Sequence, residues 1–585
     1  MRPPTRHPAA NQATPADLSR ASHPARDAAR AMDQWLNARL AKATSGLSPA
    51  AVGLAATDWW LNLAQQPAFA GWLGLRAWEL AVQAATGAAQ GEPRNDDPRF
   101  RAPAWQAGWG PWLAHGQRAA EAWWAEATAL RGMTPHHREM TAFLARQWLD
   151  ATSPSNAGLA NPEVWSRTLE RRGSNLVGGA RRAIDRWRQS QGLAARQAAE
   201  PAFQPGVDVA VTPGKVVWRN ALVELIQYLP STARVHAEPV FIVPSWIMKY
   251  YILDLSPANS LVKYLVGQGH TVFCASWKNP GAEERDLGMD DYLELGLQAA
   301  LDAIAAIVPQ RKVHALGYCN GGTLLAIGAA AMARDGDDRL ASLTLLAAQT
   351  EFSEPGELGL FIDEAQVSLL EAQMAQNGYL TAQQMAGAFN LLRSNDLLWS
   401  RLINQYLLGE PQPMNDLMAW NTDATRLPAK MHSQYLRQLF LHDDLAENRY
   451  RVGAQPVSLA DVHIPVFLVG TETDHVAPWR SVYKLHYLTP AEVSFVLTSG
   501  GHNAGIVNPP GASKRHYRQW VSVAGSSRLG PDHWLATAPQ YQGSWWTAWQ
   551  RWLREHSAAA GKPPRLGLTG ARRLDDAPGR YVLEK

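Results

Sequence analysis

The chain has very little cysteine: its 585 residues include only two, Cys274 and Cys319. Two thiols cannot make a disulfide framework, and a secreted protein of this length usually carries more, so a reducing, cytoplasmic compartment is expected. The N-terminal residues are rich in Arg and Pro but lack the continuous apolar region of a secretory signal. No apolar run approaches the roughly 18 residues that a membrane-spanning helix needs, so any association with a membrane surface is predicted to be peripheral.

The chain also lacks a strong excess of charge of either sign. Its formal net charge is +3, and residues 1–30 alone hold five Arg against two Asp, which accounts for the whole excess. The rest of the chain is balanced, so no nucleic-acid-binding surface is expected. We predict a flexible basic tail over residues 1–40 and a globular protein after it, because 46% of the residues are hydrophobic and only 18% are charged.

Tryptophan, by contrast, is abundant: thirteen of the 25 tryptophans precede residue 200. From Leu47 to Trp187, Trp, Leu and Ala recur three and four positions apart, which is typical of amphipathic helices. We therefore predict an N-terminal helical domain over residues 41–200, which ends in the Ala-, Gln- and Pro-rich stretch from Gln191 to Pro205. Two interpretations of the tryptophans remain open: the core and docking face of that domain, or an exposed amphipathic surface for a hydrophobic phase or a partner subunit.

Beyond residue 200, short apolar segments alternate with helical ones, which predicts a mostly parallel, doubly wound α/β sheet. This domain is expected over residues 201–560, with a C-terminal tail over residues 561–585. More than a hundred residues separate the predicted strand that ends at Ala347 from the one that begins at Val466, so a helical cap insertion is predicted over about residues 351–450. The expected strands are Ala221 to Tyr228, Pro239 to Pro244, Thr271 to Trp277, Val313 to Leu316, Leu343 to Ala347, Val466 to Val469 and Val493 to Leu497.

A strand-to-helix turn carries the first candidate catalytic residue. The segment from Gly317 to Gly321 reads Gly-Tyr-Cys-Asn-Gly and follows a predicted strand directly. This is the nucleophile-elbow pattern G-x-S-x-G with Cys in place of Ser, where small residues are needed on both sides because the turn is so sharp. Cys319 would then lie at a helix N-terminus, where the helix dipole favours the thiolate. Taken alone, the motif also fits a buried Cys beside a glycine-rich turn.

Two downstream residues favour the catalytic interpretation. Asp474 and His502 each come just beyond the carboxyl end of a predicted strand. The chain order nucleophile, Asp, His is the order of the α/β-hydrolase fold, so we predict the triad Cys319, Asp474 and His502, with His475 as a weaker rival base. His502 would take the proton of Cys319, and Asp474 would hold the imidazole and stabilise its charged form.

The tetrahedral intermediate of such a reaction needs two preorganised hydrogen-bond donors. We predict an oxyanion hole made by the backbone N–H groups of Asn320, directly after the nucleophile, and of Ile247 or a neighbour in the loop after Pro244. A thiolate exchanges one thioester for another at little cost in free energy. Cys at the nucleophile position therefore favours acyl transfer over hydrolysis.

Several longer stretches carry a family resemblance. They are Ser153 to Asn156, Asn161 to Val164, Val211 to Val217, Pro244 to Leu255, Gly269 to Phe273, Ser276 to Pro280, Trp420 to Asp423, Asp474 to Trp479 and Gly501 to Pro510. On these residues the chain resembles a polyhydroxyalkanoate synthase of the single-subunit type over nearly its whole length. It departs from the pattern of that family at Ser245, Asn320 and Asn503, where the family usually has a Pro, a small apolar residue and an apolar residue.

The resemblance implies that an (R)-3-hydroxyacyl-coenzyme A loads its acyl group onto Cys319, and that a hydroxyl activated by His502, helped by Asp474, extends the polyester. It implies no metal and no cofactor, since coenzyme A enters as part of the substrate. A homodimer at the surface of cytoplasmic polymer granules is also implied, with the cap controlling entry. Two rival hypotheses are a Cys-dependent thioesterase or polyester hydrolase on the same fold, and a non-catalytic granule-associated protein.

Overall fold

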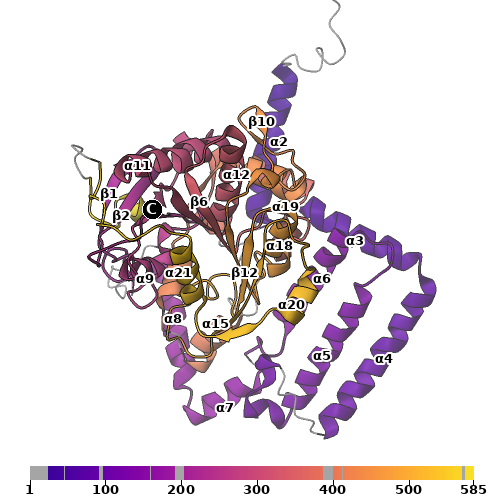
Figure 1. Ribbon diagram of the computed structural model, residues 1–585. Coiled ribbons are helices and arrows are strands. Elements are labelled where there is room, and N and C mark those ends of the chain that lie inside the picture. Colours follow the sequence, from indigo (N-terminus) through magenta and orange to yellow (C-terminus); the bar gives the residue numbers. More distant parts are fainter. Residues whose placement is uncertain are drawn as a thin grey trace, which may run out of the picture.

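The computed structural model is built around one ten-stranded sheet with helices on both faces (Figure 1). It describes residues 24–44, 46–90, 97–158, 160–191, 203–385, 399–410, 413–568 and 574–585. The strands lie in the order β1-β2-β4-β3-β5-β6-β11-β12-β13-β14, and all neighbours from β4 to β12 are parallel. The predicted, mostly parallel α/β sheet is thus confirmed. The strands are β1 (Gly214–Arg219), β2 (Val223–Tyr228), β3 (Val240–Val243), β4 (Val272–Trp277), β5 (Val313–Tyr318), β6 (Leu340–Leu346), β11 (Val466–Thr471), β12 (Val493–Thr498), β13 (His516–Ser522) and β14 (Gln540–Gln542).

All seven predicted strands are present, each with ends within three residues of the prediction. Three further strands, β1, β13 and β14, were not expected. They pair antiparallel at the two edges of the sheet, and β13 and β14 are partly exposed to solvent. Edge strands of this kind lack the continuous apolar run that marks a strand buried on both faces, so the sequence pattern does not reveal them.

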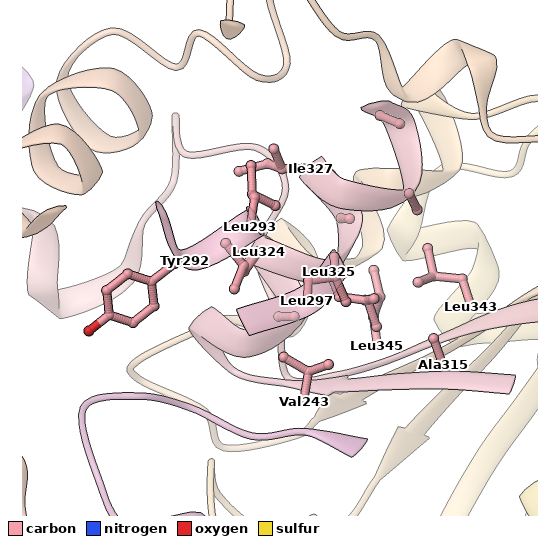
Figure 2. Packing of buried hydrophobic residues seen from close by; sticks show 14 of the residues in the cluster. Val243, Tyr292, Leu293, Leu297, Ala315, Leu324, Leu325, Ile327, Leu343 and Leu345 are labelled. Atoms are coloured by element: carbon pink, nitrogen blue, oxygen red, sulfur yellow. The ribbon is translucent and has the colours of Figure 1, made fainter. Parts of the chain in front are cut away.

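The core lies on both faces of the sheet. On one face, Leu293 and Leu297 of the π-helical turn η5 (Tyr292–Gln298) pack with Leu324 of α12 (Asn320–Asp335) over the strands (Figure 2). The approach is close because α12 carries Gly328, where a Cβ atom would lie 2.1 Å from Leu297 Cδ2. Helices α9 (Leu261–Gly267) and α21 (Trp545–Glu555) cover the other face. The remaining helices of this domain are α10 (Met289–Asp291), α11 (Ala299–Ile307), α18 (Trp479–Tyr483), α19 (Leu485–Leu488) and α20 (Pro531–Thr537).

The N-terminal part is helical and lies mostly to one side of the sheet (Figure 1). The prediction of a flexible tail over residues 1–40 is wrong from Pro24 onward, because helix α2 (Pro24–Ala43) begins there. Residues 1–23 lie outside the described residues. Helix α2 packs on the cap helix α13 (Glu364–Asn377), and Ala38 and Ala41 of α2 are fully buried. The expected domain boundary near residue 200 also lies outside the described residues. The helices are α2 (Pro24–Ala43), α3 (Pro49–Ala64), α4 (Pro67–Gln90), α5 (Gly110–Ala127), α6 (Pro135–Thr152), α7 (Pro162–Glu170) and α8 (Ser174–Ser190).

Most tryptophans of this helical region face outward. Trp105 is buried, but nine of the thirteen are exposed, with Trp78 reaching 72% exposure. Because so few contribute to a core, the structure favours the second interpretation of the tryptophans, an apolar surface. No helix among the described residues is long and apolar enough to cross a bilayer. The exposed tryptophans are Trp35, Trp60, Trp72, Trp78, Trp109, Trp112, Trp148, Trp165 and Trp187.

The long insertion between β6 and β11 forms a cap over the carboxyl ends of the strands. Part of the cap predicted over about residues 351–450 lies outside the described residues. The described elements of the cap are η6 (Gly356–Phe361), α13 (Glu364–Asn377), β7 (Tyr379–Leu380), α15 (Ser400–Leu402), η8 (Ile403–Leu408), α16 (Asp416–Asn421), β8 (Leu427–Pro428), α17 (Ala429–Gln434) and η9 (Tyr435–Leu441), followed by the small hairpin β9 (Arg451–Val452) and β10 (Gln455–Pro456).

The C-terminal residues return to the sheet. The N–H of Val216 donates to Asp575 O at 2.9 Å, so the last segment runs beside β1. Further on, the buried ammonium of Lys249 donates to Tyr581 O at 2.9 Å and to Glu584 O at 2.7 Å. Lys249 lies in the loop after β3, so the end of the chain supports a loop that borders the carboxyl edge of the sheet.

Three buried histidines predict a loss of stability in mild acid. Burial lowers the pKa of His270 to about 3, and that of His314 and His486 to about 4. The unfolded chain binds protons below pH 6.5 while these folded-state rings stay neutral, so stability falls as the pH drops from 6.5 toward 4. Each ring contributes up to about 1.4 kcal/mol per pH unit in that window. Thermal unfolding followed between pH 7.5 and pH 5 measures the effect.

His270→Leu provides the control for that measurement, because neither ring nitrogen of His270 has a hydrogen-bond partner among the described residues. The variant is expected to flatten the dependence of the melting temperature on pH between pH 6.5 and pH 5. An unchanged slope in the variant would contradict the assignment.

Candidate active site

Cys319 lies at a sharp turn between β5 and α12. Its backbone adopts φ 54° and ψ −130°, a positive-φ conformation that a non-glycine residue adopts only under constraint. The constraint comes from close backbone packing: a Cβ atom at Gly317 would lie 2.4 Å from Gly322 Cα, and one at Gly321 would lie 2.4 Å from Pro244 O. Glycine is therefore required at both positions, and the turn presents the Cys319 side chain at the start of α12.

The predicted partners of Cys319 meet beside it. His502 Nδ1 is 2.8 Å from Asp474 Oδ2, and the Asp474 side chain is fully buried. Asp474 also accepts the N–H groups of Val476 and Ala477, each at 2.8 Å, and the hydroxyl of Thr471 at 3.0 Å. These bonds fix the carboxylate and orient the imidazole, so Nε2 of His502 is the ring nitrogen left available to Cys319, whose charge acts on the ring.

The electrostatics of this pair follow from burial and charge. Burial alone would raise the pKa of Asp474, but the His502 charge, its hydrogen bond and two backbone N–H groups outweigh burial and lower it. Burial alone would lower the pKa of His502, but Asp474 and Cys319 outweigh it and raise that pKa well above the ordinary value. A proton that leaves the thiol is therefore held firmly on the imidazole.

The loop after β3 borders the nucleophile. Asn320 begins α12, and its backbone N–H has no acceptor among the described residues. The Oδ1 atom of the same residue accepts the N–H of Trp246 at 3.3 Å, and Ser245 Oγ accepts the N–H of Ile247 at 3.3 Å. Both predicted oxyanion donors thus lie on segments that border Cys319, and the bond that occupies the Ile247 N–H is long and therefore weak.

A second chain of hydrogen bonds crosses the site on the histidine side. The hydroxyl of Tyr318, the residue before the nucleophile, donates to Asn503 Oδ1 at 2.5 Å. Asn503 Nδ2 in turn donates to Asn421 Oδ1, in the cap, at 3.1 Å. Since Asn503 directly follows His502, one side chain links the elbow, the histidine loop and the cap. The sequence singled out Asn503 only as a departure from the family pattern and did not suggest this role.

A cavity of about 170 Å³ opens onto Cys319. Its wall is mostly apolar and comes largely from the cap, but Gly46 and Leu47 of the turn between α2 and α3 also line it. Gln366 of α13 holds that turn in place: its Oε1 accepts the N–H of Ser48 at 2.8 Å, and its Nε2 donates to Gly46 O at 2.6 Å. Nothing in the sequence indicated that the N-terminal region contributes to the cavity beside Cys319. The cap residues of the wall include Leu358, Phe361, Leu370, Gln373, Leu380, His432, Tyr435, Leu436 and Phe440.

No group of three or more His, Cys, Asp or Glu side chains in the described ranges is placed so that it could hold a metal ion. The other thiol, Cys274, is buried on β4, and burial raises its pKa well above the usual value. Cys319, half-buried at the cavity, is the accessible thiol of the two.

Comparisons with known proteins cover most of the chain. Residues 27–68 match the family described as poly-beta-hydroxybutyrate polymerase N terminal, and residues 96–265 match the family described as poly-beta-hydroxybutyrate polymerase (PhaC) N-terminus. Residues 238–509 match the alpha/beta hydrolase fold, which confirms the predicted fold class.

Three curated relatives share this extent. The poly(3-hydroxyalkanoate) polymerase of Methylorubrum extorquens is 42% identical over 466 residues, which cover 79% of this chain and 76% of that protein. The poly(3-hydroxyalkanoate) polymerase subunit PhaC of Rhizobium meliloti is 39% identical, over 78% of this chain and 75% of that protein. The corresponding subunit of Cupriavidus necator is 38% identical, over 77% and 76%.

The bond between Tyr318 and Asn503 gives a testable prediction. Asn503→Leu leaves the buried Tyr318 hydroxyl without its acceptor and should destabilise the protein by about 1–3 kcal/mol. Tyr318→Phe removes the hydroxyl itself, so the double variant should be destabilised by less than the sum of the single variants. Denaturant titrations of the four proteins measure this coupling, and strictly additive effects would show that the bond contributes nothing.

Proposed function

The chain belongs to the poly(3-hydroxyalkanoate) polymerase family, and we propose that it polymerises the acyl groups of (R)-3-hydroxyacyl-coenzyme A by covalent catalysis on Cys319. The names of its relatives support the polymerase activity. The observation that carries the catalytic assignment is the row of thiol, imidazole and buried carboxylate formed by Cys319, His502 and Asp474.

In the first half-reaction the acyl group moves to the enzyme. His502 Nε2 takes the proton of the Cys319 thiol, and the thiolate attacks the thioester carbonyl of the substrate. The tetrahedral intermediate collapses with cleavage of the bond to the coenzyme A sulfur, which takes the proton from the imidazolium and leaves as free coenzyme A. Asp474 stays ionised throughout and stabilises the imidazolium.

In the second half-reaction a hydroxyl replaces the enzyme thiol. His502 accepts the proton of the 3-hydroxyl of an incoming unit, whose oxygen attacks the thioester on Cys319. An ester bond forms, the bond to Cys319 Sγ breaks, and the proton on the imidazole returns to the sulfur. The backbone N–H groups of Asn320 and Ile247 donate hydrogen bonds to the oxyanion in both half-reactions. The Ile247 N–H must first break its bond to Ser245 Oγ.

No cofactor takes part in this proposed sequence. Each half-reaction is an acyl transfer in which protons move only between sulfur, oxygen and imidazole, so no oxidant, reductant or Lewis acid is needed to balance it. Prolonged treatment with a chelator is therefore expected to leave the rate of coenzyme A release unchanged.

Brief exposure to 3-hydroxybutyryl-coenzyme A followed by peptide mass spectrometry tests the proposal. We expect an acyl adduct on Cys319, polymer as the product, and no adduct or coenzyme A release with Cys319→Ala. Cys274→Ala is the matched control: it removes the buried thiol and should keep the adduct. Free 3-hydroxybutyrate as the only product would instead establish a thioesterase or hydrolase, and no turnover at all would favour a non-catalytic granule protein.

We also propose that the protein acts as a homodimer at the surface of polymer granules in the cytoplasm. Support for granule attachment comes from the apolar stripe on α4, where Trp72, Leu75, Trp78 and Val82 recur at helical spacing and are all exposed. An exposed stripe of this kind suits a hydrophobic phase, because burial of apolar area drives the association.

Leu75→Ser combined with Trp78→Ser is expected to lower the fraction of protein that sediments with polyester particles by several-fold, because two large exposed side chains no longer enter the apolar phase. Coenzyme A release from soluble substrate should stay unchanged. Val523→Ser, an exposed residue outside the helical region, is the control. Analytical ultracentrifugation of the same proteins separates loss of granule binding from loss of dimerisation. If the double variant sediments with the particles as the wild-type protein does, the stripe on α4 is not the attachment site.

A further inference from the structure

One side chain in the wall of the catalytic cavity has no role in the mechanism above. His432 lies on cap helix α17 and lines the same cavity as Cys319. It is only 6% exposed, so it belongs to the interior. Its neighbours in the wall, Leu436 and Phe440, are apolar.

His432 is also unpartnered. Two other buried imidazoles have hydrogen-bond partners: His314 contacts Ser342 and Ser557, and His486 contacts Tyr483 O. The buried ring of His270 has none among the described residues, but unlike His432 it does not line the cavity. Among the described residues, the His432 ring has no hydrogen bond and no ion pair. Burial alone lowers its pKa to about 4, so the ring is neutral at physiological pH.

A second polar side chain of the same wall also has an atom without a hydrogen-bond partner. Gln373, on α13, lines the cavity, and its buried Oε1 has no hydrogen-bond partner among the described residues. Burying a polar group without a partner costs free energy, and folded proteins usually avoid this cost. Two such groups in a cavity that opens onto a nucleophile indicate a ligand with hydrogen-bonding groups of its own.

We propose that His432 is a substrate-binding residue that hydrogen-bonds the 3-hydroxyl of the acyl group carried to Cys319. This inference rests on the proposed function. A neutral imidazole donates from one nitrogen and accepts at the other, which matches a hydroxyl that does both. The apolar part of the wall suits the alkyl part of the same acyl group. An acyl group without the 3-hydroxyl would leave the ring unpaired, so His432 would select for 3-hydroxy acids.

The test compares two substrates on each protein. Acylation rates of Cys319 are measured by rapid quench and mass spectrometry with 3-hydroxybutyryl-coenzyme A and with butyryl-coenzyme A, which lacks only the hydroxyl. The wild-type protein is expected to prefer the hydroxylated substrate. His432→Phe should lower this preference by about tenfold, and His432→Gln, which keeps hydrogen-bonding groups, should restore part of it.

A ratio of two rates on one protein is not affected by a misfolded fraction, so a partly unfolded variant still gives an answer. Leu436→Ala is the control, because it reshapes the apolar wall without removing a polar group and should leave the preference unchanged. An equal preference in wild type and His432→Phe would overturn the inference while leaving the polymerase proposal intact. Failure of the wild-type protein to load either acyl group would overturn the polymerase proposal itself.

Discussion

The candidate active site depends on how closely the start of α12 approaches the loop after β3. At Gly321 the gap to Pro244 O leaves no room for even one additional carbon atom. This contact holds the backbone of Cys319 in its unusual conformation and brings Trp246 and Ile247 beside the nucleophile. The core under α12, with Gly328 against Leu297, keeps the helix seated so that the turn cannot relax. The candidate nucleophile and the predicted oxyanion donors are thus positioned by one packing constraint.

The polar residues around this constraint form two bridges. On one side the Asn320 amide oxygen holds the Trp246 N–H, and on the other Asn503 joins Tyr318 to the cap. Both asparagines replace residues that are usually apolar in the family resemblance. The replacements therefore exchange apolar packing for directional bonds, which hold the loops at fixed angles as well as at fixed distances.

Much of this arrangement was predictable from local patterns. The buried strands stand out as apolar runs, and the elbow is marked by glycines that a tight turn requires. The order of Cys319, Asp474 and His502 along the chain then suffices to predict their meeting, because parallel strands end at one edge of a sheet. Edge strands such as β13 were missed because they are half exposed, and α2 was missed because its Arg- and Pro-rich surroundings obscure its helical period.

The parts that could not be predicted depend on contacts between distant segments. His432 and Gln366 lie in the cap insertion, and the sequence pattern does not show what its helices pack against. Neither the absence of a partner for the His432 ring nor the hydrogen bonds of Gln366 could therefore be predicted. Only the folded arrangement of the cap shows which side chains face the cavity.

The clasp between Gln366 and the turn at Gly46 and Ser48 has a consequence for how the chain can be divided. The sequence suggests a natural cut near residue 200, after which the sheet, the nucleophile and its partners are all retained. A fragment that begins there would nevertheless lack Gly46 and Leu47, which line the cavity, and would leave the buried amide of Gln366 without its two partners. The two parts of the protein are separate in the sequence, but both line the cavity beside Cys319.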